Sequence, residues 1–242
     1  MAQHTYPPDE QFRFSLLKSM YDPAIQMYRD DQIVIVRERK PKASIHYLML
    51  PHEAIDTARD LRPHHIPLLR HMLQKGNEFA DEFVRPHTHY PVILGFHTIA
   101  TFIRLHMHII STDFNGPGGE TSGDYREFVH RELWVEPDRA IYLLEREGRI
   151  PVNEELCRSI KLSPTEPMPC YFCKERFIYI PKLQKHLMTH EEELHRKDQA
   201  FKTDCRYCRP VPMFFKRNKR LFLSAAVAGM VVSGASIVSK MF

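Results

Sequence analysis

Two histidines separated by one residue, His106 and His108, follow Arg104 in a segment where polar and aliphatic residues alternate. This period of two predicts a strand with one face toward a core and the other carrying the polar groups. Two imidazoles and a guanidinium on one face suit an anionic ligand such as a phosphate, and a neutral imidazole there can act as a nucleophile. The same pair is also compatible with half of a metal site or with a polar face that has no role.

The composition limits the class of protein. A chain of 242 residues with 43% hydrophobic and 26% charged residues is typical of one or two globular domains. The formal net charge of +4 permits a nucleic-acid partner without requiring one. Four of the five cysteines stand in two Cys-x-x-Cys pairs, which favours metal binding over disulfides and a reducing compartment. The first 30 residues are polar and contain Pro7, Pro8 and Asp9, so we expect no secretory signal.

Several segments of regular structure must position the histidine pair. Residues rich in Ile, Val and Tyr predict strands over 28–37, 45–50, 92–97 and 102–110. Helices are predicted over 12–20, over 63–84 and from Pro137 to about Arg146, the last stopping at Gly148. The loop 115–124, with four glycines and a proline, is predicted to be a flexible connection. It is not a phosphate-binding loop, because it lacks a lysine followed by Ser or Thr. Five further histidines without partner motifs are expected to lie outside any site: His64, His65, His71, His87 and His89.

Short motifs give the chain a specific resemblance. Residues 104–110 resemble the histidine triad motif, His-x-His-x-His followed by two apolar residues, of a superfamily of nucleotide hydrolases and transferases. Residues 37–51 resemble the segment that carries the other histidine of that superfamily. Four motifs are similar to the aprataxin family in particular: Ser-Met-x-Asp-Pro from Ser19, Pro-Lys-Ala, Gly-Phe-His and Ser-x-Asp-Phe. A zinc finger after the domain adds to this resemblance, which covers roughly residues 12–195.

The resemblance implies both a fold and an activity. The fold would be of the α+β class, a histidine triad fold with a five-stranded antiparallel sheet and packed helices over residues 12–162. The activity would be removal of AMP from DNA 5′ ends left by abortive ligation, through a covalent AMP–histidine intermediate, in single-strand break repair. The partners would be nicked or 5′-adenylated DNA, with AMP as product, in the nucleus. No catalytic metal is expected.

The resemblance also implies roles for individual residues. His106 would be the nucleophile, and His97 would assist the leaving group. The residues implied to bind the nucleotide or its phosphate are Glu38 (at the ribose), Lys42, His46, Thr101, Arg104 and His108. Phe12, which precedes them in the chain, would stack on a terminal base pair of DNA.

The chain departs from the family pattern at three places. Arg104 replaces the first triad histidine, so an always-charged group stands where a proton-exchanging one is usual and more of the leaving-group protonation falls on His97. Thr101 replaces a serine but keeps a hydroxyl. Residues 118–124, Gly-Gly-Glu-Thr-Ser-Gly-Asp, lack the lysines expected there, which should weaken DNA affinity and its salt dependence. Two alternatives therefore stay open: an enzyme for a small adenylated substrate, and a non-catalytic module that binds nucleic acid or protein.

A second motif begins after the proline-rich segment 163–169, which we interpret as a linker. Cys170, Cys173, His186 and His190 have the spacing of a two-Cys, two-His zinc finger, predicted over 170–195. Fewer than 30 residues bury too little surface to fold without the ion, so the zinc would be structural.

The partner of the finger is less constrained by the sequence. The base-facing positions of its helix would be Tyr179, Lys182 and Lys185, and the two lysines are candidates for holding DNA phosphates. A finger that packs only against the first domain or a protein partner is the alternative.

The C-terminal part has a different character. A basic linker is predicted over 196–220, followed by residues 221–239 without a charge. Residues 221–241 could anchor the protein in an intracellular membrane with the catalytic part in the cytosol, or could form a hydrophobic helix that docks on protein. Cys205 and Cys208 have no clear ligand partners and are not assigned.

Overall fold

The computed structural model describes residues 15–173 and 175–204 of the chain. The chain divides into two units, Met1–Phe201 and Lys202–Phe242, and the sheet and the sites described below lie in the first. Phe12, Cys205, Cys208 and the 221–241 segment lie outside the described residues, so the expectations for them remain predictions. Within the described residues, no helix is both long enough and apolar enough to cross a lipid bilayer.

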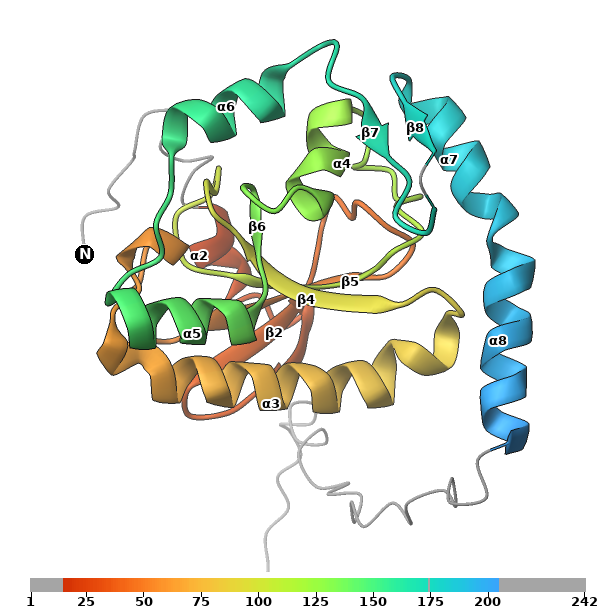
Figure 1. Cartoon of the computed structure of the whole chain (residues 1–242). Helices are drawn as coiled ribbons and strands as arrows, with labels where there is room; N and C mark the ends of the chain where they lie inside the picture. The colour runs from red at the N-terminus through yellow and green to blue at the C-terminus, as the bar shows by residue number, and fades with distance from the viewer. Residues whose placement is uncertain (1–14, 174, 205–242) are drawn as a thin grey trace, which may run out of the picture. The chain divides into compact units, whose positions relative to one another are not determined.

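A six-stranded sheet with the order β1-β2-β3-β5-β4-β6 forms the centre of this unit (Figure 1). All neighbouring strands are antiparallel. The strands are β1 Gln26–Arg29, β2 Ile33–Arg37, β3 His46–Pro51, β4 Val92–His97, β5 Met107–Ser111 and β6 Trp134–Val135. The sheet thus has the expected antiparallel architecture and one short strand, β6, beyond the expected five.

The predicted strand 28–37 is divided into β1 and β2 by a turn at Asp30. One carboxylate oxygen of Asp30 accepts hydrogen bonds from the backbone N–H groups of Gln32 and Ile33, at 2.8 and 2.9 Å. An aspartate that binds backbone groups two and three residues later stabilises a turn in place of an extended chain.

Helices cover both faces of the sheet. Figure 1 shows α3 (Ile66–Phe83) and α5 (Pro137–Glu147) beside each other on one face. Both match predicted helices, and Gly148 ends α5 with a φ of 71°, a left-handed conformation that glycine adopts without strain. On the other face lie α2 (Ser15–Ser19) and α4 (Ser122–Val129), with α6 (Glu154–Leu162) packed on α4. Neither α4 nor α6 was predicted from the sequence.

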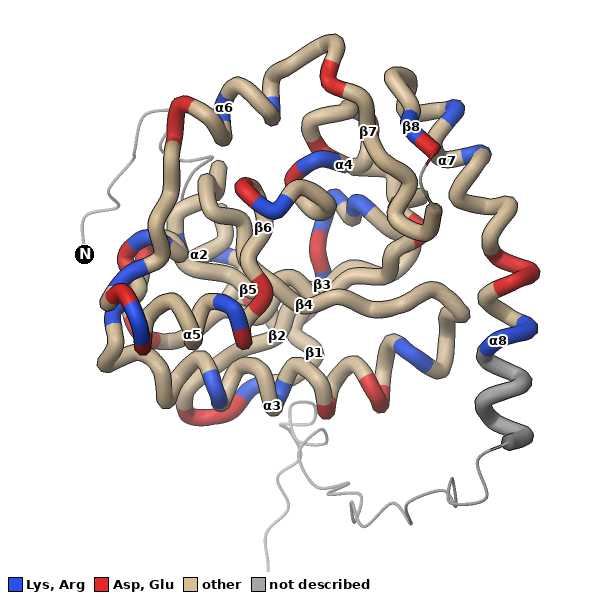
Figure 2. The backbone as a smooth tube through the Cα atoms, in the orientation of Figure 1, with Lys and Arg blue, Asp and Glu red and all other residues tan. Residues whose placement is uncertain are grey.

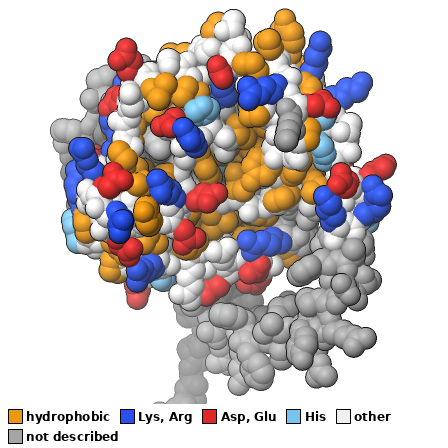
Figure 3. Space-filling view, viewed as in Figure 1, with side chains coloured by type: hydrophobic (Ala, Val, Ile, Leu, Met, Phe, Trp, Pro, Cys, Tyr) orange, Lys and Arg blue, Asp and Glu red, His pale blue; other side chains and the backbone are white. Residues whose placement is uncertain are grey.

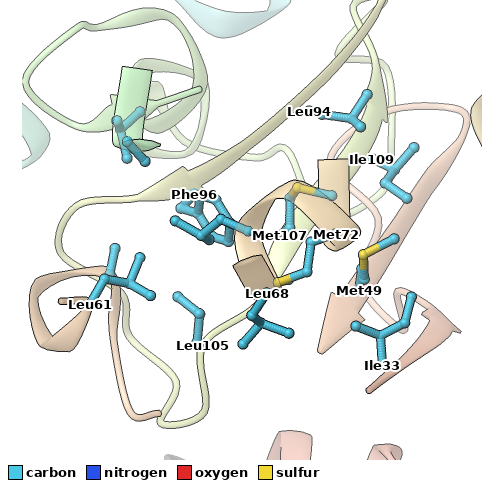
Figure 4. Packing of buried hydrophobic residues seen from close by; sticks show 14 of the residues in the cluster. Ile33, Met49, Leu61, Leu68, Met72, Leu94, Phe96, Leu105, Met107 and Ile109 are labelled. Atoms are coloured by element: carbon cyan, nitrogen blue, oxygen red, sulfur yellow. The ribbon is translucent and has the colours of Figure 1, made fainter. Parts of the chain in front are cut away.

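Alternation along the strands separates two apolar layers. Ile33 and Ile35 of β2 and Met49 of β3 belong to the large cluster around α3, in which Leu68 and Met72 of the helix are also buried (Figure 4). The intervening residues Val34, Val36 and Leu48 pack with Leu16 of α2 on the opposite face. His46 shares the parity of Leu48, and His108 is the residue of β5 that pairs with Leu48. The two histidines therefore lie on the face that carries α2 and α4.

The predicted finger is continuous with the core of the sheet. It consists of β7 (Met168–Pro169), β8 (Arg176–Phe177) and α7 (Ile180–Thr189), and α8 (Glu191–Asp204) follows. Leu183 and Leu187 of α7 belong to the same buried cluster as Ile110 of β5 and Phe128 of α4. The finger thus begins two residues before Cys170, packs against the first domain, and leads into a helix where a linker was predicted.

The prediction that loop 115–124 is a flexible connection is wrong. A Cβ on Gly116 would lie 2.2 Å from the Pro41 carbonyl oxygen, and one on Gly118 would lie 2.3 Å from that of Lys40. The glycines therefore permit a close approach between two backbone segments. Gln184 of the finger helix adds hydrogen bonds to the carbonyl groups of Phe114 and Gly119, at 3.3 and 3.4 Å.

Charged residues of both signs are mixed over the molecule. Figure 2 shows basic and acidic positions interspersed along α3 and α5, and the face in Figure 3 likewise carries both signs side by side. An exposed pair, Arg70 with Glu145 at 2.9 Å, links these two helices. Exposed pairs of this kind contribute roughly 0–1 kcal/mol each. On the viewed face no broad basic surface is present.

Candidate active site

His106 has a free ring nitrogen. Its Nδ1 lies 2.9 Å from the backbone carbonyl oxygen of Arg104. Because a carbonyl oxygen can only accept a hydrogen bond, Nδ1 carries the proton and Nε2 of the neutral ring carries a lone pair. The side chain is only 5% exposed, so the packing around it fixes this arrangement. His106 therefore has the protonation state that a nucleophile requires.

A chain of hydrogen bonds fixes the opposite state in His108. The backbone N–H of Lys42 donates to Nδ1 of His46, at 3.2 Å. The proton of neutral His46 must then be on Nε2, which lies 2.8 Å from Nδ1 of His108 and donates to it. His108 is thereby left with its own proton on Nε2, a buried atom that has no hydrogen-bond partner among the described residues. Such an unsatisfied donor costs about 1–3 kcal/mol and is suited to a phosphate oxygen.

His97, the last residue of β4, completes the histidine cluster. Its ring centroid lies 4.2 Å from that of His108, and its Nε2 is also buried without a hydrogen-bond partner among the described residues. Phe128 and Trp134 pack edge-on against the His97 ring, with centroids 4.8 and 5.6 Å away. The Trp134 ring lies over Gly95, where a Cβ would be only 2.4 Å from it. The glycine of the Gly-Phe-His motif therefore makes room for the aromatic wall.

Burial keeps all four imidazoles neutral. It lowers the pKa of His46 to about 3 and lowers the pKa of His106 below the ordinary histidine value of 6.5. Burial also lowers the pKa values of His97 and His108 well below 6.5, and the neighbouring histidines add to the effect. At neutral pH the site therefore holds uncharged nitrogen donors and acceptors rather than imidazolium ions.

The buried histidines predict a steep loss of stability in mild acid. An unfolded histidine binds a proton near pH 6.5, whereas these four folded ones remain neutral, so stability is present above pH 6.5 and falls as the pH drops below it. Each histidine can contribute a slope of up to about 1.4 kcal/mol per pH unit. Denaturant titrations at pH 7.5, 6.0 and 5.0 should show this fall, with a smaller slope for His46→Gln. Equal unfolding free energies at all three pH values would contradict the assignment.

A pocket of about 480 Å³ opens above the histidines. Its apolar side chains are Leu16 of α2, Val36 of β2, Leu48 of β3, Phe102 and Phe128 of α4. Pockets for small molecules usually combine an apolar lining with a few polar groups that fix the orientation of the ligand, and this pocket has both. Seven residues selected from the sequence line this one pocket: Glu38, Lys42, His46, His97, Thr101, His106 and His108.

Arg104 does not share the face of His106, so this part of the sequence prediction is wrong. The strand begins at Met107 rather than near residue 102, and Arg104 has a φ of 94°, which turns the backbone before β5. Its guanidinium donates to the carbonyl oxygen of Glu53 at 2.8 Å and does not line the pocket. The alternation read from the sequence fails here because a residue at positive φ breaks the period of two.

We therefore expect Arg104→Ala to change turnover of a substrate bound in this pocket by less than about threefold, as for a surface side chain. The contribution of residue 104 to the site is a backbone carbonyl, which any amino acid supplies. Arg104→Gly should in addition relieve left-handed strain of about 1–3 kcal/mol and raise the melting temperature. Steady-state kinetics and thermal unfolding measure both effects. A hundredfold loss of turnover in Arg104→Ala would contradict this prediction and would show that the guanidinium acts in the site.

Lys42 is held by the loop that follows β5. Its Nζ donates to the carbonyl oxygen of Gly118 at 2.5 Å and to Asp124 Oδ1 at 2.6 Å. Burial would raise the pKa of Asp124, but hydrogen bonds from Lys42 and Thr121 outweigh it and hold the pKa low. The acidic loop noted in the sequence thus supplies a counter-ion to a lysine of the pocket.

Sequence reasoning missed a further group of pocket residues: Phe102, Asp124, Glu127, Phe128 and Lys161. Most lie on α4 or α6, which carry no catalytic motif. The one available signal was the Thr-x-x-Asp pattern at Thr121, which begins α4 as a reciprocal cap with Asp124. That pattern locates the helix but does not indicate that it borders a site.

The four predicted metal ligands converge. The ligand atoms of Cys170, Cys173, His186 and His190 all lie within 4.8 Å of one another. Each Sγ lies close to one imidazole Nε2, Cys170 to His190 at 3.4 Å and Cys173 to His186 at 3.3 Å, and the two Nε2 atoms are 3.1 Å apart. Tetrahedral zinc with bonds of about 2.3 Å to sulfur and 2.0 Å to nitrogen would separate such atoms by about 3.3–3.6 Å. The donor set and its spacing therefore fit zinc.

The finger helix also carries the lysines predicted to hold phosphates. Lys182 and Lys185 are both exposed, and Lys182 Nζ lies 5.5 Å from the centre of the Tyr179 ring. Among the described residues, neither lysine forms an ion pair, so both are available to bind a phosphate.

Comparisons with known proteins agree with this geometry. Residues 13–123 match the family described as scavenger mRNA decapping enzyme C-terminal binding. Aprataxin of Danio rerio is 34% identical over 175 residues, which cover 72% of this chain and 52% of that protein. Aprataxin of Gallus gallus is 31% identical over 175 residues, covering 72% of this chain and 54% of that protein. The chain thus spans about half the length of the curated relatives it matches.

Solved structures share the fold. The aprataxin ortholog Hnt3 in complex with DNA superimposes with a TM-score of 0.65 at 22% identity, covering 78% of this chain and 99% of that one. A crystal structure of the aprataxin ortholog Hnt3 from Schizosaccharomyces pombe gives a TM-score of 0.53 at 23% identity, covering 71% of this chain and 87% of that one. At this identity the match establishes a common fold.

Proposed function

This chain is a relative of aprataxin, and from that premise we propose that it is a hydrolase of the histidine triad superfamily that removes AMP from 5′-adenylated DNA ends. Nicked or 5′-adenylated DNA would be its substrate and DNA single-strand break repair its process, with a nuclear location as for a DNA repair enzyme. The observation that carries the proposal is the pairing of an unprotonated Nε2 on His106 with a buried, unsatisfied N–H on His108.

The proposed reaction has two steps. In the first, Nε2 of His106 attacks the α-phosphorus of the adenylate, a P–N bond forms, and the P–O bond to the DNA 5′-phosphate breaks, with the electron pair leaving on that phosphate. The Nδ1–H bond to the Arg104 carbonyl stabilises the positive charge that develops on the ring. In the second, water attacks phosphorus, the P–N bond breaks, and AMP leaves while His106 recovers its lone pair.

The remaining pocket residues act on charge and orientation. The His108 Nε2–H would donate to a non-bridging oxygen, where negative charge grows in the transition state. His46 would hold His108 in the required tautomer rather than touch phosphate itself. His97 would assist the leaving oxygen, and Glu38, at the pocket rim, would bind the ribose hydroxyls. Thr101 and Lys42 line the same pocket and would bind phosphate oxygens.

We also propose that Cys170, Cys173, His186 and His190 hold a structural zinc ion. Catalysis would need no metal.

Three histidines of the pocket, His97, His106 and His108, place ring nitrogens within 4.8 Å of one another, a spacing that a metal ion could also use. The Lys42–His46–His108 hydrogen bonds, however, leave a proton on Nε2 of His108, where a metal ion would need a lone pair.

Lys182 and Lys185 on the finger helix would contact DNA phosphates.

A second candidate is hydrolysis of a small adenylated molecule. It is favoured by the loop 114–124, which packs on the Lys42 segment and offers acidic side chains where DNA-binding lysines were expected. A tail anchor in an intracellular membrane would suit this alternative, and the 221–241 segment lies outside the described residues. The non-catalytic alternative was favoured only by Arg104, whose side chain does not line the pocket.

Two substrates separate the candidates. The full chain is incubated with 5′-adenylated nicked DNA and, separately, with adenosine phosphoramidate, and release of AMP is followed on gels and by chromatography. The proposal expects faster release from DNA, with a rate that falls as salt increases because phosphate contacts are screened. Release from the phosphoramidate without release from DNA would favour the small substrate. Lys182→Gln with Lys185→Gln should weaken only the reaction with DNA.

A further inference from the structure

Positive charge is scarce beside the histidines of the pocket. Arg37, Arg39 and Lys40 also line the pocket, but the cations that lower the pKa values of the buried histidines are Lys42 and Lys161. All four histidines are neutral, and Arg104 lies outside the pocket. Lys42 already binds both Gly118 and Asp124. A transferring phosphoryl group is stabilised mainly by fixed positive charge and donors aimed at its oxygens. A further cation beside the histidines would supply what the triad segment lacks.

Lys161 of α6 is placed to be that cation. Its side chain lines the pocket together with Thr101, whose hydroxyl lies 3.5 Å from Lys161 Nζ. Nζ forms an ion pair with Glu127 of α4, and 27% of the lysine side chain is exposed against 9% for the glutamate. The lysine side chain is thus more exposed than that of its glutamate partner, which is buried. The pKa of His97 is lowered first by burial, then by His106, and then by the charge of Lys161. The Lys161 charge therefore lies beside the histidine cluster.

The position of Lys161 is fixed through the backbone of its helix. Arg126 of α4, nearly fully buried, donates to the carbonyl oxygens of Lys161 at 3.1 Å and Ser163 at 2.5 Å. These carbonyl groups end α6, where backbone acceptors have no partner within the helix. A Cβ on Gly123 would lie 2.9 Å from the Lys161 carbonyl oxygen, so the glycine permits the two helices to approach. The end of α6 is therefore held against α4 independently of the lysine side chain.

Glu127 acts as the holding partner. Burial raises the pKa of this carboxyl group and the nearby lysine opposes the rise, so a charged Glu127 depends on Lys161. A buried carboxylate without a partner would be costly and would take up a proton instead. The pair therefore holds the Lys161 side chain at the pocket before substrate arrives.

We propose that Lys161 is a phosphate-binding residue of the adenylate site, with Glu127 as the residue that positions it. This inference rests on the proposed function, since it assumes that the pocket binds an adenylate. On binding, Nζ would be shared between Glu127 and a non-bridging oxygen of the α-phosphate. No bond to Lys161 is made or broken in the reaction.

Equilibrium binding of two probes tests the proposal without relying on turnover. AMP and adenosine differ by the phosphate alone, and their affinities for the full chain are measured by calorimetry. Lys161→Met should weaken AMP binding about tenfold, which corresponds to about 1.4 kcal/mol, and leave adenosine binding unchanged. Lys161→Arg should recover part of the loss. The matched control is Arg158→Met, which removes an exposed charge from the same helix and should leave both affinities unchanged.

The outcomes are distinct. Unchanged AMP affinity in Lys161→Met would overturn the role of Lys161 while the proposed function stands. Equal weakening of AMP and adenosine would show a purely structural role and would also overturn it. If Lys161→Met does not fold because Glu127 is left unpaired, the double variant Lys161→Met, Glu127→Gln removes both charges and must show the same selective loss of AMP binding. Failure of the wild type to release AMP from any substrate would remove the proposed function and leave this binding test intact.

Discussion

His106→Ala should abolish release of AMP from 5′-adenylated DNA, with a loss of about 10⁴-fold or more, as for removal of a catalytic nucleophile. The substitution removes the one imidazole of the pocket whose hydrogen bond to a backbone carbonyl leaves Nε2 unprotonated. His46 and His108 cannot replace it, because the bonds from the Lys42 backbone place protons on their Nε2 atoms.

Binding should survive the same substitution. The groups proposed to hold the phosphate and the apolar wall of the pocket are intact in His106→Ala. We therefore expect its affinity for AMP to stay within about threefold of the wild type, since this change alters chemistry rather than binding. His87→Ala, on an exposed histidine outside the pocket, is the matched control for both measurements. Appreciable turnover by His106→Ala would require a different nucleophile.

Removal of the finger's metal should destabilise the sheet domain as well as the finger. Zinc contributes about 10–16 kcal/mol of binding free energy to isolated fingers, and the whole stability of a typical domain is only about 5–15 kcal/mol. Leu183 and Leu187 of the finger helix are buried in one cluster with Phe128 of α4. Gln184 also binds the loop that holds Lys42. Loss of the metal should therefore lower the melting temperature and impair turnover together.

Thermal unfolding with and without a chelator measures this effect. Cys173→Ser should lower the melting temperature of the full chain to about that of chelated wild type, and chelator should have little further effect on the variant. Cys157→Ser, at a buried cysteine of α6 outside the finger, should retain its response to chelator. The zinc proposal would be refuted if chelator left the melting temperature of the wild type unchanged and the purified protein contained no metal.

The parts of the fold that the sequence predicted are those governed by local pattern. The apolar spacing of α3, the proline and glycine that bound α5, and the β-branched runs of β2 and β4 each determine their own conformation. The Gly-Phe-His and His-x-His segments likewise carried enough information to select His97, His106 and His108. The structure brings these three side chains into one pocket.

The parts that escaped prediction depend on distant contacts. Nothing near Arg104 in the sequence indicates that its backbone turns to a φ of 94° before β5 begins. The glycines of loop 115–124 suggested freedom, yet Gly116 and Gly118 are required by the carbonyl groups of Pro41 and Lys40, which lie far away in the sequence. Lys161 enters the pocket through packing between α4 and α6, which no short motif reveals.

The central claim is that His106 carries the adenylyl group between the two steps. The direct measurement is a rapid mix of the full chain with 5′-adenylated nicked DNA, an alkaline quench that preserves a phosphoramidate, and mass spectrometry of the resulting peptides. The account predicts a transient adenylyl adduct on His106 that forms and decays at rates consistent with AMP release. An adduct on any other residue, or AMP release at the normal rate with no adduct within the time resolution of the quench, would contradict it.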